Sequence, residues 1–220
     1  EDFTCGLLED GSIECWGEYK RSPFIEWPSG RYSSIEAGGA LVCGLSDAGR
    51  LECTDVDEAE PISTPDATFE QIGIGGRTNC GVMDSGAIEC WSGWGSETDA
   101  SLPPEGAFRQ VETSGSFTCA INRAGKLKCW GEDGFGETDP PSGAFKQLSV
   151  GGAHGCAIAD SGAVQCWGYD HYGQTQAPDG KFVQVASGDN HSCAVTAKGR
   201  VECWGEDDNG QTNPPSVWQD

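Results

Sequence analysis

Basic residues are scarce in this chain of 220 residues. Thirteen Lys and Arg stand against 35 Asp and Glu, which gives a formal net charge of −22 at pH 7. A surface with this excess of negative charge repels the phosphates of nucleic acids and the headgroups of anionic membranes. The sequence therefore excludes nucleic acid as an expected partner. It favours a cationic partner or a divalent metal, although the same charge also serves solubility alone.

Long apolar runs and common catalytic motifs are missing as well. No stretch of 18 apolar residues occurs, so the sequence predicts no membrane insertion. A nucleophile elbow, an HExxH zinc motif and a phosphate-binding loop are all absent. Two of the three His residues, His154 and His191, recur two positions before a Cys, which favours a structural role. We therefore expect no enzyme and no cofactor, while a glycosidase using two carboxylates in a central channel stays open.

The twelve cysteines form six pairs, and the members of every pair are ten positions apart. An even number of cysteines at regular spacing indicates disulfides formed in an oxidising compartment, so we expect a secreted, periplasmic or cell-surface protein. The alternative is zinc, which needs four ligands where each pair supplies two. The pairs are Cys5 and Cys15, Cys43 and Cys53, Cys80 and Cys90, Cys119 and Cys129, Cys156 and Cys166, and Cys193 and Cys203.

Each pair brackets a predicted β-hairpin. In the first unit, CGLLEDGSIEC, pairing Cys5 with Cys15 and Leu7 with Ile13 leaves the three-residue loop 9–11. Gly11 stands where a type I turn with a G1 bulge requires positive φ. The cysteines are then directly opposed at ~4.5–5.5 Å between Cα atoms, close enough for a disulfide. The glycines at the equivalent place are Gly49, Gly86, Gly125, Gly162 and Gly199.

The hairpin belongs to a repeat of about 37 residues that occurs six times. A Phe-x-Gln strand precedes the hairpin, and a Cys-Trp-Gly sequence leads to Gly-Gln-Thr, where we expect a short fourth strand. Four antiparallel strands in a repeat of this length are typical of a propeller blade. The sequence thus predicts an all-β, six-bladed β-propeller of four-stranded antiparallel blades. The Phe-x-Gln strands are expected at 69–72, 108–111, 145–148 and 182–185, and the core tryptophans are Trp16, Trp91, Trp130, Trp167 and Trp204.

The two ends of the chain complement each other. Residues Val217–Asp220 look like the start of another Phe-x-Gln strand, and the first unit lacks this strand. We expect this C-terminal strand to pair into the N-terminal blade and close the ring, which removes both sheet edges. The chain is then a single domain, 1–220, with blades at 217–220 plus 1–30, 31–67, 68–106, 107–143, 144–180 and 181–216.

The repeat resembles that of the regulator of chromosome condensation family. In the last unit the matching residues are His191-Ser192-Cys193-Ala194-Val195, Gly199, Trp204-Gly205 and Gly210-Gln211-Thr212, and all six units share the pattern. The resemblance implies a propeller of six or seven blades, and counting favours six. Family members include an exchange factor for a small GTPase, plant receptor-kinase ectodomains and a propeller-type β-lactamase inhibitor, the last being closest in repeat length. The resemblance implies a propeller face that binds another protein.

The loops before each first Cys and after each Cys-Trp-Gly are expected on one face of the propeller. They vary in sequence while the scaffold does not, and they combine aromatic residues with acids, as protein interfaces do. A weaker possibility is calcium bound by Asp55, Asp57 and Glu58 in the divergent second unit. The aromatic residues predicted to bind a partner are Tyr19, Phe24, Trp27, Trp94, Phe117, Phe135, Tyr169, His171 and Tyr172.

The sequence therefore favours an extracellular recognition module that binds another protein through an acidic, aromatic-rich loop face. One alternative is a structural subunit of a surface filament or matrix, because charge and disulfides suit it equally. Another is a calcium- or glycan-binding propeller. The sequence leaves the partner and the oligomeric state open.

Overall fold

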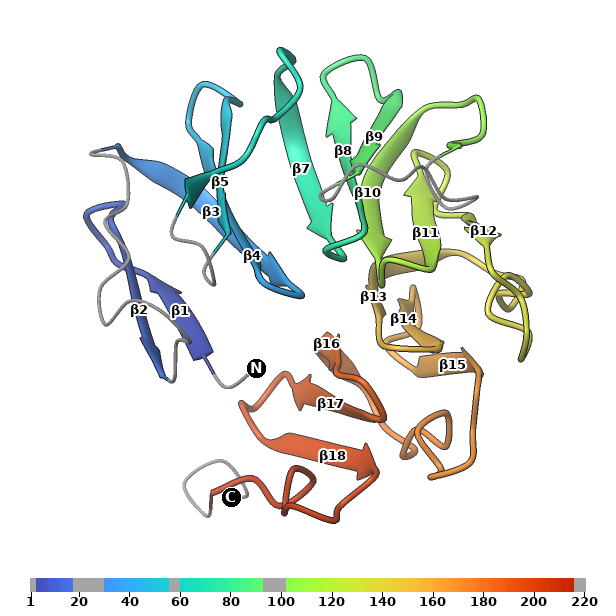
Figure 1. The fold of residues 1–220 in the computed structure, drawn as a ribbon. Coiled ribbons are helices and arrows are strands. Elements are labelled where there is room, and N and C mark those ends of the chain that lie inside the picture. The colour runs from blue at the N-terminus through green and yellow to red at the C-terminus, as the bar shows by residue number, and fades with distance from the viewer. Residues whose placement is uncertain (1–2, 18–29, 56–59, 93–101, 216–220) are drawn as a thin grey trace.

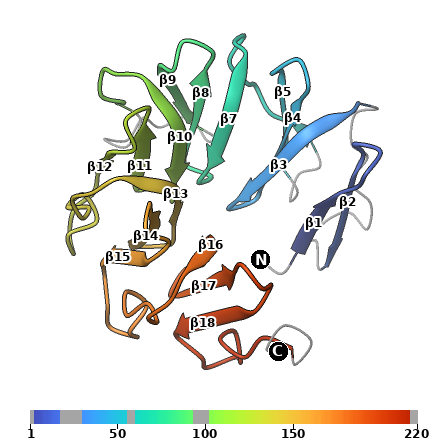
Figure 2. The same cartoon turned by 180° about the vertical axis from the view of Figure 1, so that it is seen from behind.

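The structure is a computed structural model that describes residues 3–17, 30–55, 60–92 and 102–215. Every regular element in these ranges is a β-strand, and the strands form six sheets arranged in chain order around a common centre (Figure 1; Figure 2 from behind). The all-β fold and the six sheets agree with a six-bladed propeller. None of the described segments forms a helix with the length and apolar character needed to cross a bilayer.

The sheets are built from consecutive strands. The first three sheets contain β1 (Phe3–Leu7) and β2 (Ile13–Gly17); β3 (Tyr32–Gly38), β4 (Leu41–Ser46), β5 (Leu51–Asp55) and β6 (Glu60–Pro61); and β7 (Phe69–Ile74), β8 (Thr78–Met83) and β9 (Ile88–Ser92). The last three contain β10 (Phe108–Thr113), β11 (Phe117–Asn122) and β12 (Leu127–Gly131); β13 (Phe145–Val150), β14 (His154–Ala159) and β15 (Val164–Gly168); and β16 (Phe182–Ser187), β17 (His191–Thr196) and β18 (Val201–Gly205).

The predicted hairpins are confirmed in all six sheets. Cys5 pairs with Cys15 and Leu7 with Ile13, and the other five hairpins repeat this register. All six disulfides form between directly opposed cysteines, with Cα atoms 4.0–4.1 Å apart. The turn glycines have positive φ, from 74° at Gly49 to 91° at Gly162, as the predicted bulge requires.

The Phe-x-Gln strands are also confirmed, as β7, β10, β13 and β16. They contact one another from sheet to sheet, which places them nearest the centre of the ring (Figure 1). Their first side chains are buried; Phe108 and Phe145, for example, are both 1% exposed. Phe145 and Leu148 of β13 pack against Phe117 and Ile121 of β11 in the neighbouring sheet. The core is therefore a series of apolar layers between adjacent blades.

The Gln of the Phe-x-Gln strand joins each blade to the next. Gln147 Oε1 accepts from Val185 N at 2.8 Å, and its Nε2 donates to Val185 O at 2.9 Å. Gln110 does the same with Leu148 and Gln71 with Val111. The amide side chain thus pairs with a backbone like a short strand, and we call this paired contact the Gln clamp.

The predicted fourth strand is wrong for most of the described sheets. Four sheets have three strands, one has two, and only β3–β6 has four, with β6 just two residues long. The Gly-Gln-Thr sequence, which is Gly-Glu-Thr in the fourth unit, forms a turn instead, because Gly136, Gly173 and Gly210 have φ of 83°, 77° and 78°. Strand closure by residues 217–220 lies outside the described residues.

Candidate functional site

The two ends of the strands make two different faces. At one end lie the turns before each first Cys and the segments after each Trp-Gly, joined by backbone bonds such as Glu132 N to Ser116 O at 3.0 Å and Tyr169 N to Ala153 O at 2.9 Å. We call this end the loop face. Its described parts are 39–40, 75–77, 114–116, 132–139, 151–153, 169–176, 188–190 and 206–213. The six Gly hairpins occupy the opposite end, the hairpin face.

The loops after Trp-Gly share one internal scaffold. An Asp carboxylate accepts the backbone N–H of the Thr five residues later, as Asp133 does from Thr138 at 3.0 Å and Asp170 from Thr175 at 2.9 Å. Burial raises the pKa of Asp170, but hydrogen bonds from Thr175 and Gln176 outweigh it, so that the pKa lies below its usual value and the carboxylate stays charged. In the last blade Asp207 accepts from Thr212 N at 3.0 Å in the same way.

A second hydrogen bond fixes the residue before the turn glycine. Glu137 Oε2 accepts from Phe135 N at 2.6 Å, and Gln174 Oε1 accepts from Tyr172 N at 2.9 Å. Glu137 and Gln174 are 5% and 0% exposed, so the side chains that hold the loop are buried. Phe135 and Tyr172 are 61% and 43% exposed. The Gly-Gln-Thr sequence therefore holds one exposed residue at a fixed place, which we call the tip residue; in the last blade it is Asn209.

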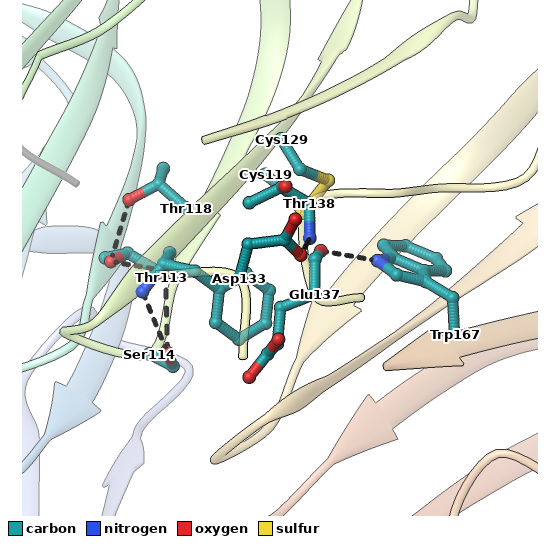
Figure 3. The surroundings of a disulfide bond; sticks show 10 residues. Thr113, Ser114, Thr118, Cys119, Cys129, Asp133, Glu137, Thr138 and Trp167 are labelled. Atoms are coloured by element: carbon teal, nitrogen blue, oxygen red, sulfur yellow. Dashed lines mark hydrogen bonds between the residues drawn. A yellow bond between two sulfur atoms is a disulfide. The ribbon is translucent and has the colours of Figure 1, made fainter. Parts of the chain in front are cut away.

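The next blade anchors each scaffold from outside. The Trp167 indole donates to Glu137 O at 2.8 Å, and the Trp204 indole donates to Gln174 O at 2.8 Å. Figure 3 shows the Asp133 carboxylate turned to the backbone of Thr138 and the Trp167 ring turned to the carbonyl of Glu137. Both tryptophans are buried, at 7% and 8% exposure, as expected for core residues.

Four of the predicted partner-binding residues come together on the loop face. The ring of Tyr169 lies 4.8 Å from Phe135 of the preceding blade, edge to face, and 6.1 Å from His171. Tyr172 meets His171 edge to face at 5.1 Å. His171 is exposed and Tyr169 partly buried. We call these four residues the aromatic cluster; it bridges two blades and is carried by hydrogen-bonded loops.

One predicted partner-binding residue is wrong. Phe117 is 0% exposed, because it begins β11 and packs with Phe145 and Trp167 in the core between two sheets. Its backbone pairs with Gly131, so the side chain cannot reach the loop face without breaking the sheet. Four others, Tyr19, Phe24, Trp27 and Trp94, lie outside the described residues.

The described residues offer little to a metal ion. Within them, no group of three or more His, Cys, Asp and Glu side chains is placed to hold one. Of the predicted calcium ligands, Asp55 ends β5 and is 9% exposed, while Asp57 and Glu58 lie outside the described residues. Calcium binding stays a prediction.

Charge is unevenly divided between the two faces. The described parts of the loop face contain nine Asp or Glu and only one Lys or Arg, Arg77. All other described basic residues lie at the hairpin face, either in the hairpin turns or on the strand residues beside them. They are Arg31, Arg50, Arg109, Arg123, Lys126, Lys128, Lys146, Lys181, Lys198 and Arg200. The hairpin face also carries acids, such as Asp47, Asp84 and Asp160, but basic residues lie beside them. The excess of negative charge is therefore greatest on the face that carries the aromatic cluster.

Two partly buried carboxyl groups lie on the central strands. Burial raises the pKa of Glu36 in β3 to about 7. Burial, together with the charge of Glu36, raises the pKa of Glu112 in β10 to about 8. A glycine, Gly73, holds the equivalent position in the blade between them, where an added Cβ would lie 2.8 Å from Val111 O. Gln110 Nε2 donates to Glu112 Oε1 at 2.9 Å. Sequence reasoning missed this pair because nothing local marks it.

A buried histidine lies between the last two blades. His154 is 0% exposed, and its Nε2 lies 2.8 Å from Ser192 Oγ of the next blade. Burial, helped by His191, lowers the pKa of His154 to about 4. The side chain is therefore neutral at neutral pH and has a structural role.

The fold and its repeats have known counterparts. A family model described as the regulator of chromosome condensation (RCC1) repeat matches residues 108–137, 145–174 and 182–211. No curated protein sequence matches the chain.

Solved structures with the same fold include three propellers. The CRINKLY WD40 ectodomain of the Arabidopsis thaliana receptor kinase ACR4 matches with a TM-score of 0.75 and 24% identity, covering 93% of this chain and 76% of that one. The ectodomain of the Physcomitrella patens receptor kinase CR4 matches with a TM-score of 0.78 and 22% identity, covering 97% of this chain and 63% of that one. Yeast RCC1 (Prp20), solved bound to Kap60, matches with a TM-score of 0.79 and 13% identity, covering 100% of this chain and 71% of that one.

These identities show a shared fold, and the three matched segments coincide with the last three disulfide-linked sheets. The disulfide and the hairpin register recur in the other three sheets. The chain is therefore a propeller that carries repeats of the regulator of chromosome condensation type.

Proposed function

We propose that this protein is an extracellular recognition module that binds another protein through its loop face. The observation that carries the proposal is the aromatic cluster, because its exposed rings stand on loops held by side chain–backbone hydrogen bonds. Rigid aromatic side chains bury large area at little entropic cost, and they dominate binding energy at protein interfaces. Binding rather than catalysis is the role that this arrangement supports.

The scaffold explains how one repeat could serve varied binding. The Asp, Gly and Thr positions recur in the last three blades, while the tip residue changes from Phe135 to Tyr172 to Asn209. A change at the tip leaves every scaffold hydrogen bond in place, since the tip donates only its backbone N–H. Yeast RCC1, which shares the fold, has been solved bound to another protein, Kap60.

Six disulfides favour an oxidising compartment, and two of the structural neighbours are ectodomains of receptor kinases. We therefore place the protein outside the reducing cytosol, whether secreted, periplasmic or on the cell surface.

The test is capture by matched variants. The double variant Phe135→Ala/Tyr172→Ala removes two exposed rings, and Val183→Ala removes an apolar side chain that is 62% exposed on β16, near the hairpin face. We expect a protein retained from the native source by the wild type and by Val183→Ala to be lost with the double variant. Melting temperatures should agree within a few degrees, because exposed side chains contribute little to stability. Equal retention by all three proteins would refute the assignment of the site.

We also propose that the ring is closed by the C-terminal segment through the same clamp that joins the other blades. Gln184 in β16 holds the place of Gln147 in β13, yet its side chain is exposed and makes no hydrogen bond to the described residues. Its expected partner is the backbone of a strand beside β1, which Val217–Asp220 would supply by its likeness to Phe-x-Gln.

A double-mutant cycle tests this closure. Gln184→Leu and deletion of residues 216–220 should each lower the unfolding free energy by about 1–2 kcal/mol, and the double variant should cost no more than the deletion alone. Gln147→Leu, which breaks a clamp elsewhere, should add fully to the deletion. If the effects of Gln184→Leu and of the deletion on the unfolding free energy also added fully, the proposed closure would be ruled out.

A further inference from the structure

We infer that the aromatic cluster binds arginine or lysine side chains of a basic segment in the partner protein; this rests on the proposed function and specifies its partner. The first observation is the arrangement of the rings. Tyr169 and Phe135, and likewise His171 and Tyr172, meet edge to face at 61° and 86°. Neighbouring rings at such angles present π faces in different directions around one spot. A cation over the face of a Tyr or Phe ring is attracted by its negative potential.

The second observation is the acid beside the rings. Asp170 lies between Tyr169 and His171 in the chain, and its hydrogen bonds from Thr175 and Gln176 hold its pKa below the usual value. Glu132 and Asp133, both exposed, precede Phe135 in the neighbouring loop. The Asp170 carboxylate therefore stays charged at neutral pH. The bonds from Thr175 N and Thr138 N hold Asp170 and Asp133 in the loops that carry the rings. A cationic side chain on the cluster would therefore have both a π face and a carboxylate within its surroundings.

The third observation is the charge division over the whole molecule. The described loop face carries nine acidic residues and a single basic residue, Arg77, while the other described basic residues lie around the hairpin face. Such a distribution orients a basic partner before contact and accelerates its association. An acidic partner would be repelled most strongly from the loop face, which carries the rings. An uncharged glycan would gain nothing from this division, so charge complementarity favours the basic protein segment.

Arginine fits the cluster better than lysine. Its planar guanidinium stacks on aromatic rings and forms two parallel hydrogen bonds to a carboxylate, whereas the ammonium of lysine is a more strongly hydrated point charge. We therefore expect a preference for arginine within the basic class, with lysine accepted.

The probe is a fluorescein-labelled peptide of alternating Gly and Arg, compared with the same peptide carrying citrulline, which keeps the planar group and loses the charge. Fluorescence anisotropy at about 150 mM salt should show binding of the arginine peptide, and binding of the citrulline peptide at least about tenfold weaker. The variant Phe135→Leu/Tyr172→Leu, which keeps apolar bulk without π faces, should weaken arginine binding by about tenfold.

Two charge-matched variants separate a site from a general attraction. Glu132→Gln/Asp189→Asn/Asp208→Asn removes three exposed acids from the loop face, and Glu105→Gln/Asp160→Asn/Asp179→Asn removes three exposed acids near the hairpin face. The first should weaken arginine binding several-fold and flatten its salt dependence, while the second should leave both unchanged. Equal effects of the two variants would overturn the inference, because net charge alone would then explain the binding.

The outcomes also separate this inference from the proposed function. Equal binding of the citrulline and arginine peptides would overturn the cationic ligand, as would the absence of any peptide binding. If the capture experiment still depends on Phe135 and Tyr172 in that case, the loop face is an interface for a partner of another chemistry. If it does not, both proposals fail. Self-association abolished by Phe135→Leu/Tyr172→Leu would identify a second copy as the occupant and likewise overturn the basic partner.

Discussion

Replacing Trp167 with Ala should lower the unfolding free energy by about 3–5 kcal/mol, the usual cost of removing a large buried aromatic side chain. The indole is 7% exposed and packs directly over Gly155, where an added Cβ would lie 2.4 Å from Cζ2 of the ring. The same change removes the bond to Glu137 O that anchors the loop of the preceding blade. Stability and the order of the binding loop should therefore fall together.

Chemical denaturation measures the first effect and amide hydrogen exchange the second. In Trp167→Ala the amides of Phe135 and Thr138, which donate to Glu137 and Asp133, should exchange faster, while those of Tyr172 and Thr175 in the next loop change less. Trp167→Phe is the matched control, since it keeps most of the ring and should cost only about 1–2 kcal/mol. A loss below about 1 kcal/mol in Trp167→Ala would contradict the anchoring role.

The unfolding free energy should be greatest at about pH 4 and fall as the pH rises from there to 8, because the two raised carboxyl pKa values outweigh the one lowered histidine pKa. Glu112, with its pKa raised to about 8, and Glu36, raised to about 7, stay protonated in the fold where the unfolded chain ionises. Their contribution is complete below pH ~4.5 and is lost as the pH rises through 7 and 8. His154 acts in the opposite direction. Its pKa is lowered to about 4, so stability is lost as the pH falls from ~6.5 through 4.

Glu112→Gln tests the alkaline side of this profile. Gln keeps an oxygen for the bond from Gln110 but cannot ionise, and it removes the charge that Glu36 would face. Urea unfolding at pH 8 should show the variant more stable than the wild type by on the order of 3 kcal/mol, with little difference at pH 5. Glu105→Gln, an exposed control near the hairpin face, should show no such change. A wild type equally stable at pH 5.5 and pH 8 would contradict the assignment of the pair.

Most of the fold was predictable from local signals. Two cysteines ten residues apart around a turn glycine leave only one antiparallel register, and the structure has that register in every hairpin. The Gly-Gln-Thr turn was misread as a strand because four antiparallel strands are typical of a propeller blade. Its true signal is the Asp five residues before the Thr, a spacing that allows the carboxylate to cap the turn.

The site was predicted in part. Phe135, Tyr169, His171 and Tyr172 were recognised as loop aromatics, but their mutual contacts depend on how two blades are placed. Phe117 was misassigned although it stands two residues before Cys119, the same repeat position as the buried His154. That equivalence was the available signal. Glu36 and Glu112 carry no such signal, since their proximity arises only when the central strands of separate blades pack around the ring.

The central claim is that the tip residues of the loop face are the contact surface. Hydroxyl-radical footprinting measures this directly by comparing oxidation of Phe135 and Tyr172 with that of Val183, which is as exposed as Phe135 but lies near the hairpin face. With the arginine peptide or the captured partner bound, we predict several-fold protection of Phe135 and Tyr172 and no change at Val183. Protection at Val183 with unchanged oxidation of both tip residues would contradict the account.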